Sequence, residues 1–260
     1  MTAQQQQWIS FEQPLSERVR TMLRLEFLFT RAREALMQEG IWASRTAVEC
    51  LIDVMLVLGR IDLKKEFLKE LERHAVTLDS LARNPKVDPK RLENTQQQVS
   101  QFLSRLKGSE FGFGHALRYN EMFNSVRQRS AIPAGTCDFD LPAYHHWLQS
   151  DPQHRRTELL EWIGHFKLLH EATDLCLNLV RESGVTTAEQ ALGGMFQRTL
   201  ETATPCQMIR VRISSDSLMF PEISAGRHRF TVRFMQQPDP AERAAQIQSD
   251  VEFQLVCCVI

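Results

Sequence analysis

The chain has 260 residues, of which 43% are hydrophobic and 24% are charged, as expected for a globular protein that buries a full core. The 31 basic and 32 acidic residues nearly cancel, and the net charge of −1 gives the whole molecule no electrostatic reason to bind nucleic acid or an anionic membrane. The six cysteines are too sparse and too irregularly spaced for a secreted disulfide scaffold, so we expect reduced thiols.

The expected compartment follows from two features of the sequence, the composition of its first residues and the lengths of its apolar runs. The first residues, "MTAQQQQWISFEQPL", do not follow the basic-then-apolar layout of a signal peptide. No apolar run approaches the roughly 20 residues that span a bilayer. We therefore expect a cytoplasmic protein without membrane insertion.

The first part of the chain shows the period of α-helices. Apolar residues three or four apart predict helices over about 15–38, 44–58, 61–82, 89–108, 117–130 and 152–184, with a short one after Asp140. Asp88 with Pro89, and Asp151 with Pro152, each supply an N-cap followed by a first helical residue. The N-terminal region is therefore expected to be mostly helical.

Beyond residue 190 the apolar period changes to two, the period of strands. Segments 208–214, 229–234 and 249–258 alternate in this way, whereas 215–226 is predicted to be a loop. Three half-buried strands predict an antiparallel sheet, with the helices as its cover. The fold class is therefore α+β.

The expected domain organisation follows from this change of period. A mostly helical domain of residues 1–190 is predicted to pack against a C-terminal antiparallel β-sheet domain of residues 191–260. A short strand at 8–13 is a further candidate member of the sheet.

No motif in the sequence indicates an enzyme. There is no Walker A sequence, no Gly-rich strand-to-helix turn, no HExxH and no CxxC pair. His145 and His146 are adjacent and cannot both face one metal ion from a helix. Cys257 and Cys258 alternate on a strand, so one core thiol and one surface thiol are expected. We predict no catalytic residue, no metal and no cofactor.

Arginines dominate the polar positions of two predicted strands. Arg210 and Arg212 on one strand, and Arg229 and Arg233 on another, would share one sheet face if the two strands pair. Residues 205–235 hold five arginines and two acids, a formal local charge of about +3. Like charges on neighbouring strands repel, so this face requires an anionic partner.

Three partners for these arginines are considered. Asp250 and Glu252 of the last strand would neutralise them within the sheet. A carboxylate-bearing peptide from another molecule would also fit guanidinium groups. Nucleic acid, bound by a cytosolic module through its basic sheet face, is the alternative function. It is the weaker one, because the phenylalanines that could stack on bases point into the core.

Five segments, in the same order along nearly the whole chain, resemble the ZapD family of bacterial cell-division proteins. They are "FEQPLSERVRTMLRLEFL", "FLKELER", "VRQRSAIPAGTCDFDLPAYHHWL", "DSLMFPEISAG" and "HRFTVRFM". The third is the most specific, since a turn of that composition has no generic explanation.

The resemblance implies a non-enzymatic homodimer that binds the C-terminal tail of FtsZ. Such a protein would cross-link and bundle FtsZ filaments at the mid-cell division ring and promote ring assembly and septation. The family's basic pocket matches Arg60, Arg229 and Arg233 here. Arg210 and Arg212 are added to this candidate site from the sheet-face argument alone.

Overall fold

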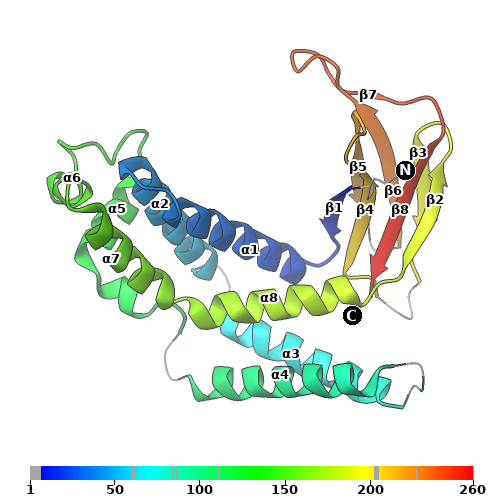
Figure 1. The fold of residues 1–260 in the computed structure, drawn as a ribbon, viewed down its shortest axis with the longest axis horizontal. Coiled ribbons are helices and arrows are strands. Elements are labelled where there is room, and N and C mark those ends of the chain that lie inside the picture. Colours follow the sequence, from blue (N-terminus) through cyan, green and yellow to red (C-terminus); the bar gives the residue numbers. More distant parts are fainter. Residues whose placement is uncertain are drawn as a thin grey trace, which may run out of the picture. The chain divides into compact units, whose positions relative to one another are not determined.

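The structure, a computed structural model, describes residues 7–59, 62–83, 85, 87–109, 112–201, 205–226 and 228–259. The chain forms two compact units, one of Thr21–Cys176 and the other of Met1–Arg20 together with Leu177–Ile260. We call them the helical unit and the strand unit. The α+β prediction is confirmed (Figure 1). The division into a helical domain of residues 1–190 and a β-sheet domain of residues 191–260 remains a prediction.

The helices begin and end close to the predicted positions. They are α1 (Glu17–Leu36), α2 (Ile41–Leu58), α3 (Leu63–Leu81), α4 (Pro89–Gly108), the 3-10 helix η1 (Ala116–Tyr119), α5 (Glu121–Arg129), α6 (Pro142–Leu148), α7 (Pro152–Gly164) and α8 (Lys167–Glu182). The predicted caps are present, because the Asp88 carboxylate accepts from the Lys90 N–H at 2.9 Å and that of Asp151 from the Gln153 N–H at 2.9 Å.

The single helix expected over 152–184 is wrong, because α7 and α8 are separate. After Gly164 the His165 and Phe166 N–H groups donate to carbonyls only three residues back, which ends α7 with tight turns. The break turns the Phe166 side chain into the core, where it is fully buried. Gly114 permits this packing, since a Cβ there would lie 2.3 Å from the Phe166 ring.

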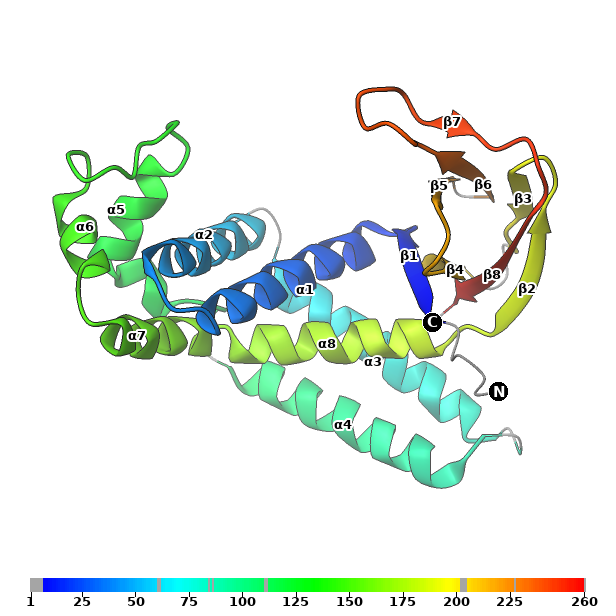
Figure 2. The same cartoon turned by 45° about the horizontal axis from the view of Figure 1, so that its top comes forward.

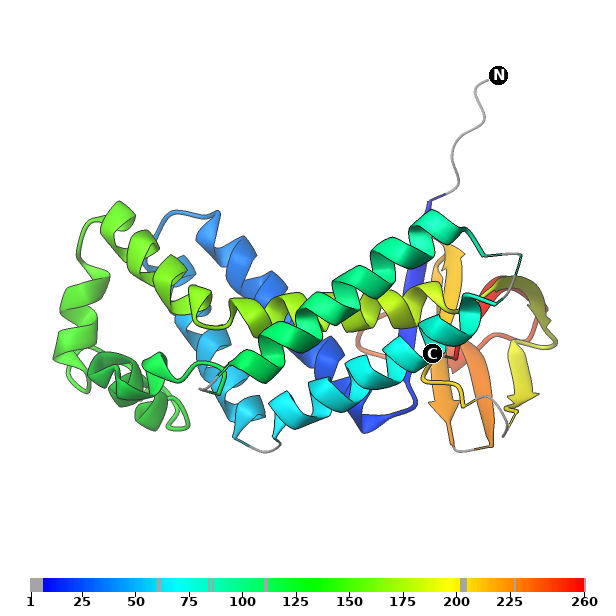
Figure 3. The same ribbon diagram turned by 90° about the horizontal axis from the view of Figure 1, so that it is seen from below.

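The helix expected over 117–130 is also interrupted, at Asn120. The side-chain oxygen of Asn120 accepts from the Phe123 N–H at 2.9 Å and so starts α5 as a separate helix. In the helical unit, α3 and α4 lie side by side and antiparallel (Figures 2 and 3). Arg105 of α4 is paired with Glu171 of α8 at 2.8 Å.

The strands of the strand unit form two antiparallel sheets. The first sheet has the order β1 (Trp8–Pro14), β4 (Met208–Ser214), β8 (Val251–Cys258) and β2 (Thr186–Ala191). The second sheet has the order β3 (Met195–Thr199), β6 (Arg229–Gln236) and β5 (Met219–Ala225), and β7 (Ala245–Gln246) pairs with the end of β6.

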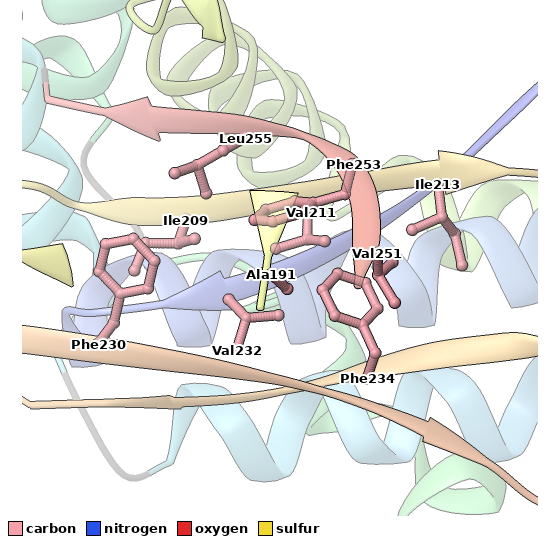
Figure 4. Close-up of a cluster of buried hydrophobic side chains, with 10 residues drawn as sticks. All are labelled: Ala191, Ile209, Val211, Ile213, Phe230, Val232, Phe234, Val251, Phe253 and Leu255. Carbon is pink, nitrogen blue, oxygen red and sulfur yellow. The ribbon is translucent and has the colours of Figure 1, made fainter. Parts of the chain in front are cut away.

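The expectation of one sheet covered by helices is wrong, because the two sheets cover each other. Side chains from both sheets meet in one core (Figure 4). Its buried members are Ala191, Ile209, Val211, Ile213, Phe230, Val232, Phe234, Val251, Phe253 and Leu255. The predicted loop 215–226 contains β5, which lies at the end of its sheet. Pro221 is tolerated there, because proline lacks the N–H that an interior strand needs.

The aromatic centre of this core joins the two sheets. The Phe253 ring of β8 lies 5.2 Å from that of Phe196 and 5.1 Å from that of Phe234, both in the second sheet. Phe253→Ala should lower the free energy of unfolding by about 3–5 kcal/mol, through lost apolar burial and a residual cavity. Urea denaturation measures this change.

The matched control is Leu218→Ala, in the same unit, because the Leu218 side chain is 84% exposed. Its stability should stay within about 0.5 kcal/mol of the parent protein. Equal losses in the two variants would contradict a core between the sheets.

Candidate functional site

The arginines predicted to share one face lie on two different sheets. Arg210 and Arg212 are on β4 of the first sheet, and Arg229 and Arg233 are on β6 of the second. Both strands turn their apolar sides to the same core from opposite sides, so their arginines point to opposite outer faces. The predicted shared face is therefore wrong. Arg60 lies outside the described residues.

Alternation along β6 is confirmed, and it defines an outer surface of the second sheet. Phe230, Val232 and Phe234 are buried, while Arg229 and Arg233 are exposed. We call this surface the second-sheet face. It consists of Arg229, Thr231 and Arg233 of β6, Met195, Gln197 and Thr199 of β3, and Glu222 and Ser224 of β5.

Arg233 has one acidic neighbour on the second-sheet face. Its Nη2 donates to the Glu222 carboxylate at 3.1 Å, across the register between β6 and β5. Both side chains are about half exposed, at 50% and 47%. Exposed pairs of this kind contribute only about 0–1 kcal/mol, so an external carboxylate can displace Glu222 at little cost.

Arg229 has no acidic neighbour in register. It lies opposite Thr199 on β3, and on its other side the Gly226 N–H donates to the Arg229 carbonyl at 2.9 Å. Its side chain is exposed and forms no ion pair with the residues that the structure describes. The Arg229 guanidinium is therefore available to an anion from another molecule.

Arg210 is committed within the strand unit. Its Nε lies 2.9 Å from Glu12 of β1, the residue opposite it in register. Arg181, in the part of α8 that belongs to the strand unit, donates through Nε and Nη2 to both oxygens of the same carboxylate, each at 2.9 Å. The three side chains are only 17–23% exposed. The Nε–H of Arg210 has no aligned acceptor, so its contact with Glu12 is ionic and not a hydrogen bond.

Arg212 lies on the same outer face of the first sheet as Arg210. Its guanidinium lies over the Trp8 ring, 5.8 Å from the ring centroid.

Neither acid considered as a partner of the arginines forms an ion pair with them among the described residues. Asp250 accepts from the Gly193 N–H at 2.9 Å and from the Gln190 amide at 3.3 Å, and Glu252 lies opposite Gln190. The intramolecular pairing with Asp250 and Glu252, which the sequence left open, is therefore not formed. Glu12 was missed, although its place among the polar positions of "WISFEQP" follows from strand alternation.

The described residues show no cluster of three or more His, Cys, Asp or Glu side chains that could hold a metal ion. Within the same described residues, no helix is both long enough and apolar enough to cross a bilayer. The geometry of the second-sheet face suits the binding of an anionic group.

Comparison with known proteins gives consistent matches over most of the chain. The family described as "ZapD: Cell division protein" matches residues 23–233. The "Cell division protein ZapD" of Methylococcus capsulatus is 40% identical over 252 residues, which is 97% of this chain and 98% of that protein. Proteins of the same name from Dechloromonas aromatica and Ralstonia pickettii are 35% and 38% identical, over 96% of this chain and 99% of each of them.

The different settings of Glu12 and Glu222 give a direct stability test. Glu12→Gln leaves two poorly exposed guanidinium groups without their shared carboxylate, so the free energy of unfolding should fall by about 2–3 kcal/mol. Glu222→Gln is the matched control at an exposed pair and should change it by less than about 0.5 kcal/mol. Urea denaturation at neutral pH measures both. Equal losses would contradict the assignment of Arg210 to a structural role.

Proposed function

Since the chain belongs to the ZapD family of cell division proteins, we propose that it binds the C-terminal tail of FtsZ and cross-links FtsZ filaments as a homodimer. A role in cell division follows from the family itself. Binding of the FtsZ tail, bundling of filaments and action at the mid-cell division ring are our proposals for this role.

The exposed Arg229, with no acid opposite it, is the observation that carries the proposal. Arg233 lies four residues further along the same strand and has only the half-exposed Glu222 as a competitor. Four residues of strand place the two Cα atoms roughly 13 Å apart, so an extended peptide could meet both guanidinium groups with two acidic side chains.

The second-sheet face also offers apolar contact. Met195 lies opposite Arg233 in register and is 47% exposed. A methionine adapts to side chains of different shapes, so it suits the apolar part of a peptide beside an arginine.

Arg60 joins the proposed pocket through the family resemblance alone. Arg210 and Arg212 are not assigned to this pocket, because they lie on the outer face of the other sheet. Arg210 is in addition neutralised by Glu12.

Bundling follows from valency. A symmetric dimer presents two identical tail sites, and a filament displays many tails. Two weak contacts made by one dimer then act together with a high effective concentration, so each dimer can hold two filaments.

The alternative of a nucleic-acid-binding module is less well supported. The phenylalanines of β6, Phe230 and Phe234, are buried in the core and cannot stack on a base. The arginines are also divided between two faces, so neither face carries all of the counted charge.

Replacing either exposed arginine should weaken peptide binding without unfolding the protein. Arg229→Ala and Arg233→Ala should each weaken binding of a fluorescently labelled FtsZ tail peptide by about tenfold, because each removes a charge-assisted contact. Arg243→Ala, at an exposed arginine elsewhere in the strand unit, is the matched control and should bind normally. Fluorescence anisotropy measures affinity, and unchanged melting temperatures establish that the variants fold.

The same anisotropy assay should also detect a variant that binds the peptide more tightly. Glu222→Gln releases Arg233 and should tighten peptide binding by roughly two- to fivefold. Unchanged affinity in both arginine variants would remove the second-sheet face from the proposal.

Bundling should require both the tails and the dimer. The parent protein should increase the pelleting of FtsZ filaments at low speed, and filaments without C-terminal tails should remain in the supernatant. Because the contacts are ionic and partly exposed, pelleting should fall steeply as salt rises from 50 to about 300 mM. A monomeric mass in sedimentation equilibrium, or equal pelleting of tailless filaments, would contradict cross-linking through tails.

A further inference from the structure

A cavity of about 320 Å³ lies at one end of the strand unit, next to a cysteine. Cys206 lines it together with Leu15, Leu200, Pro205 and Gly226. Cys206 is partly exposed, so a small molecule that enters the cavity contacts this residue.

Cys206 has a second thiol beside it. The Cys206 thiol has two acceptors within reach, the sulfur of Cys257 near the end of β8 and the Met208 carbonyl oxygen at 3.3 Å, and its single proton can go to either of them. Both cysteines pack against the edge of the sandwich core. The expectation that one of Cys257 and Cys258 is a surface thiol is wrong, because Cys258 is fully buried and Cys257 is partly buried.

A cation completes the cluster. Arg198 of β3 lies beside Cys257 and donates to Glu189 of β2 at 2.7 Å, which holds the guanidinium at the edge between the two sheets. The hydrogen bond from Cys206 lowers the pKa of Cys257 to about 7, against the effect of burial and with the help of the Arg198 charge. The same contact raises the pKa of Cys206. At neutral pH Cys257 is therefore partly ionised, while Cys206 stays a neutral thiol.

The fully buried cysteines lack these features. Burial raises the pKa of Cys50 and of Cys258, in each case to about 11, and Cys176 is also buried. Thiols of this kind react slowly, because the thiolate is the nucleophile. Reactivity should therefore concentrate at Cys257.

We propose that Cys206 and Cys257 form a peroxide-sensitive pair that closes into an intramolecular disulfide. The Cys257 thiolate attacks one oxygen of hydrogen peroxide, the O–O bond breaks, hydroxide leaves and a sulfenic acid forms. The Cys206 sulfur then attacks the Cys257 sulfur, the S–O bond breaks, and the thiol proton leaves with the oxygen as water. Two electrons pass from the sulfurs to the peroxide. The inference is independent of the proposed binding function.

Mass spectrometry of the full chain tests the pair. After about one equivalent of hydrogen peroxide at pH 7.5 and alkylation of the remaining thiols, the oxidised protein should contain two fewer alkylated cysteines, and dithiothreitol should restore both. Trypsin releases Cys206 in the peptide 199–210, and Cys257 together with Cys258 in the peptide 244–260. A Cys258→Ser background therefore assigns the cross-link to Cys257 without ambiguity.

Single variants separate the two roles. Cys206→Ser should retain the peroxide reaction and accumulate a sulfenic acid at Cys257 that dimedone traps, whereas Cys257→Ser should form no disulfide. Cys137→Ser, at a partly exposed cysteine elsewhere in the chain, is the matched control and should form the disulfide at the parent rate.

Two results would overturn the inference. One is a cross-link that maps to any pair other than Cys206 and Cys257. The other is dimedone labelling of Cys257 in Cys206→Ser that is no faster than labelling of Cys137, where we expect a difference of about tenfold or more. The disulfide is also mapped in the folded parent chain. A variant that fails to fold therefore does not prevent the test.

Discussion

The burial of two apolar strand faces against each other determines the chemistry of the strand unit. The apolar sides of β4 and β6 contribute to one core, with Val211 and Val232 both fully buried in it. Each strand must then turn its polar side outward, and the two outward directions are opposite. This single constraint separates arginines that would otherwise share one highly charged face.

The arginines on the two sheets therefore differ in their ion pairs and in their exposure to solvent. On the first sheet, Arg210 shares the Glu12 carboxylate with Arg181 in a poorly exposed cluster, where an unpaired charge would be costly. On the second sheet, Arg229 faces uncharged neighbours and Arg233 faces only an exposed glutamate. Solvent makes these two charges tolerable without a partner, so the protein can keep them available at little cost in stability.

The edges of the sandwich gather residues that are distant in the sequence. Arg198 and Glu189 come together there from different sheets, and Cys206 meets Cys257 next to them. A guanidinium, a carboxylate and two thiols meet in one partly exposed place, and a nearby cation of this kind favours the thiolate form of a cysteine. The proposed binding face and the proposed thiol pair therefore depend on the same arrangement of two sheets.

The helical starts capped by Asp88 and Asp151 and the alternation of β6 were predictable, because caps and periods are local properties of the chain. The family was predictable from five segments that keep their order along the chain. Alternation nominated Arg229 and Arg233, and the family segments added Arg60. The break between α7 and α8, the strand formed by 219–225 around Pro221, and the pairing of Glu12 with Arg210 appeared only in the tertiary structure. Strand partners and core contacts lie tens to hundreds of residues apart, so no local pattern records which strands pair or which acid reaches which arginine.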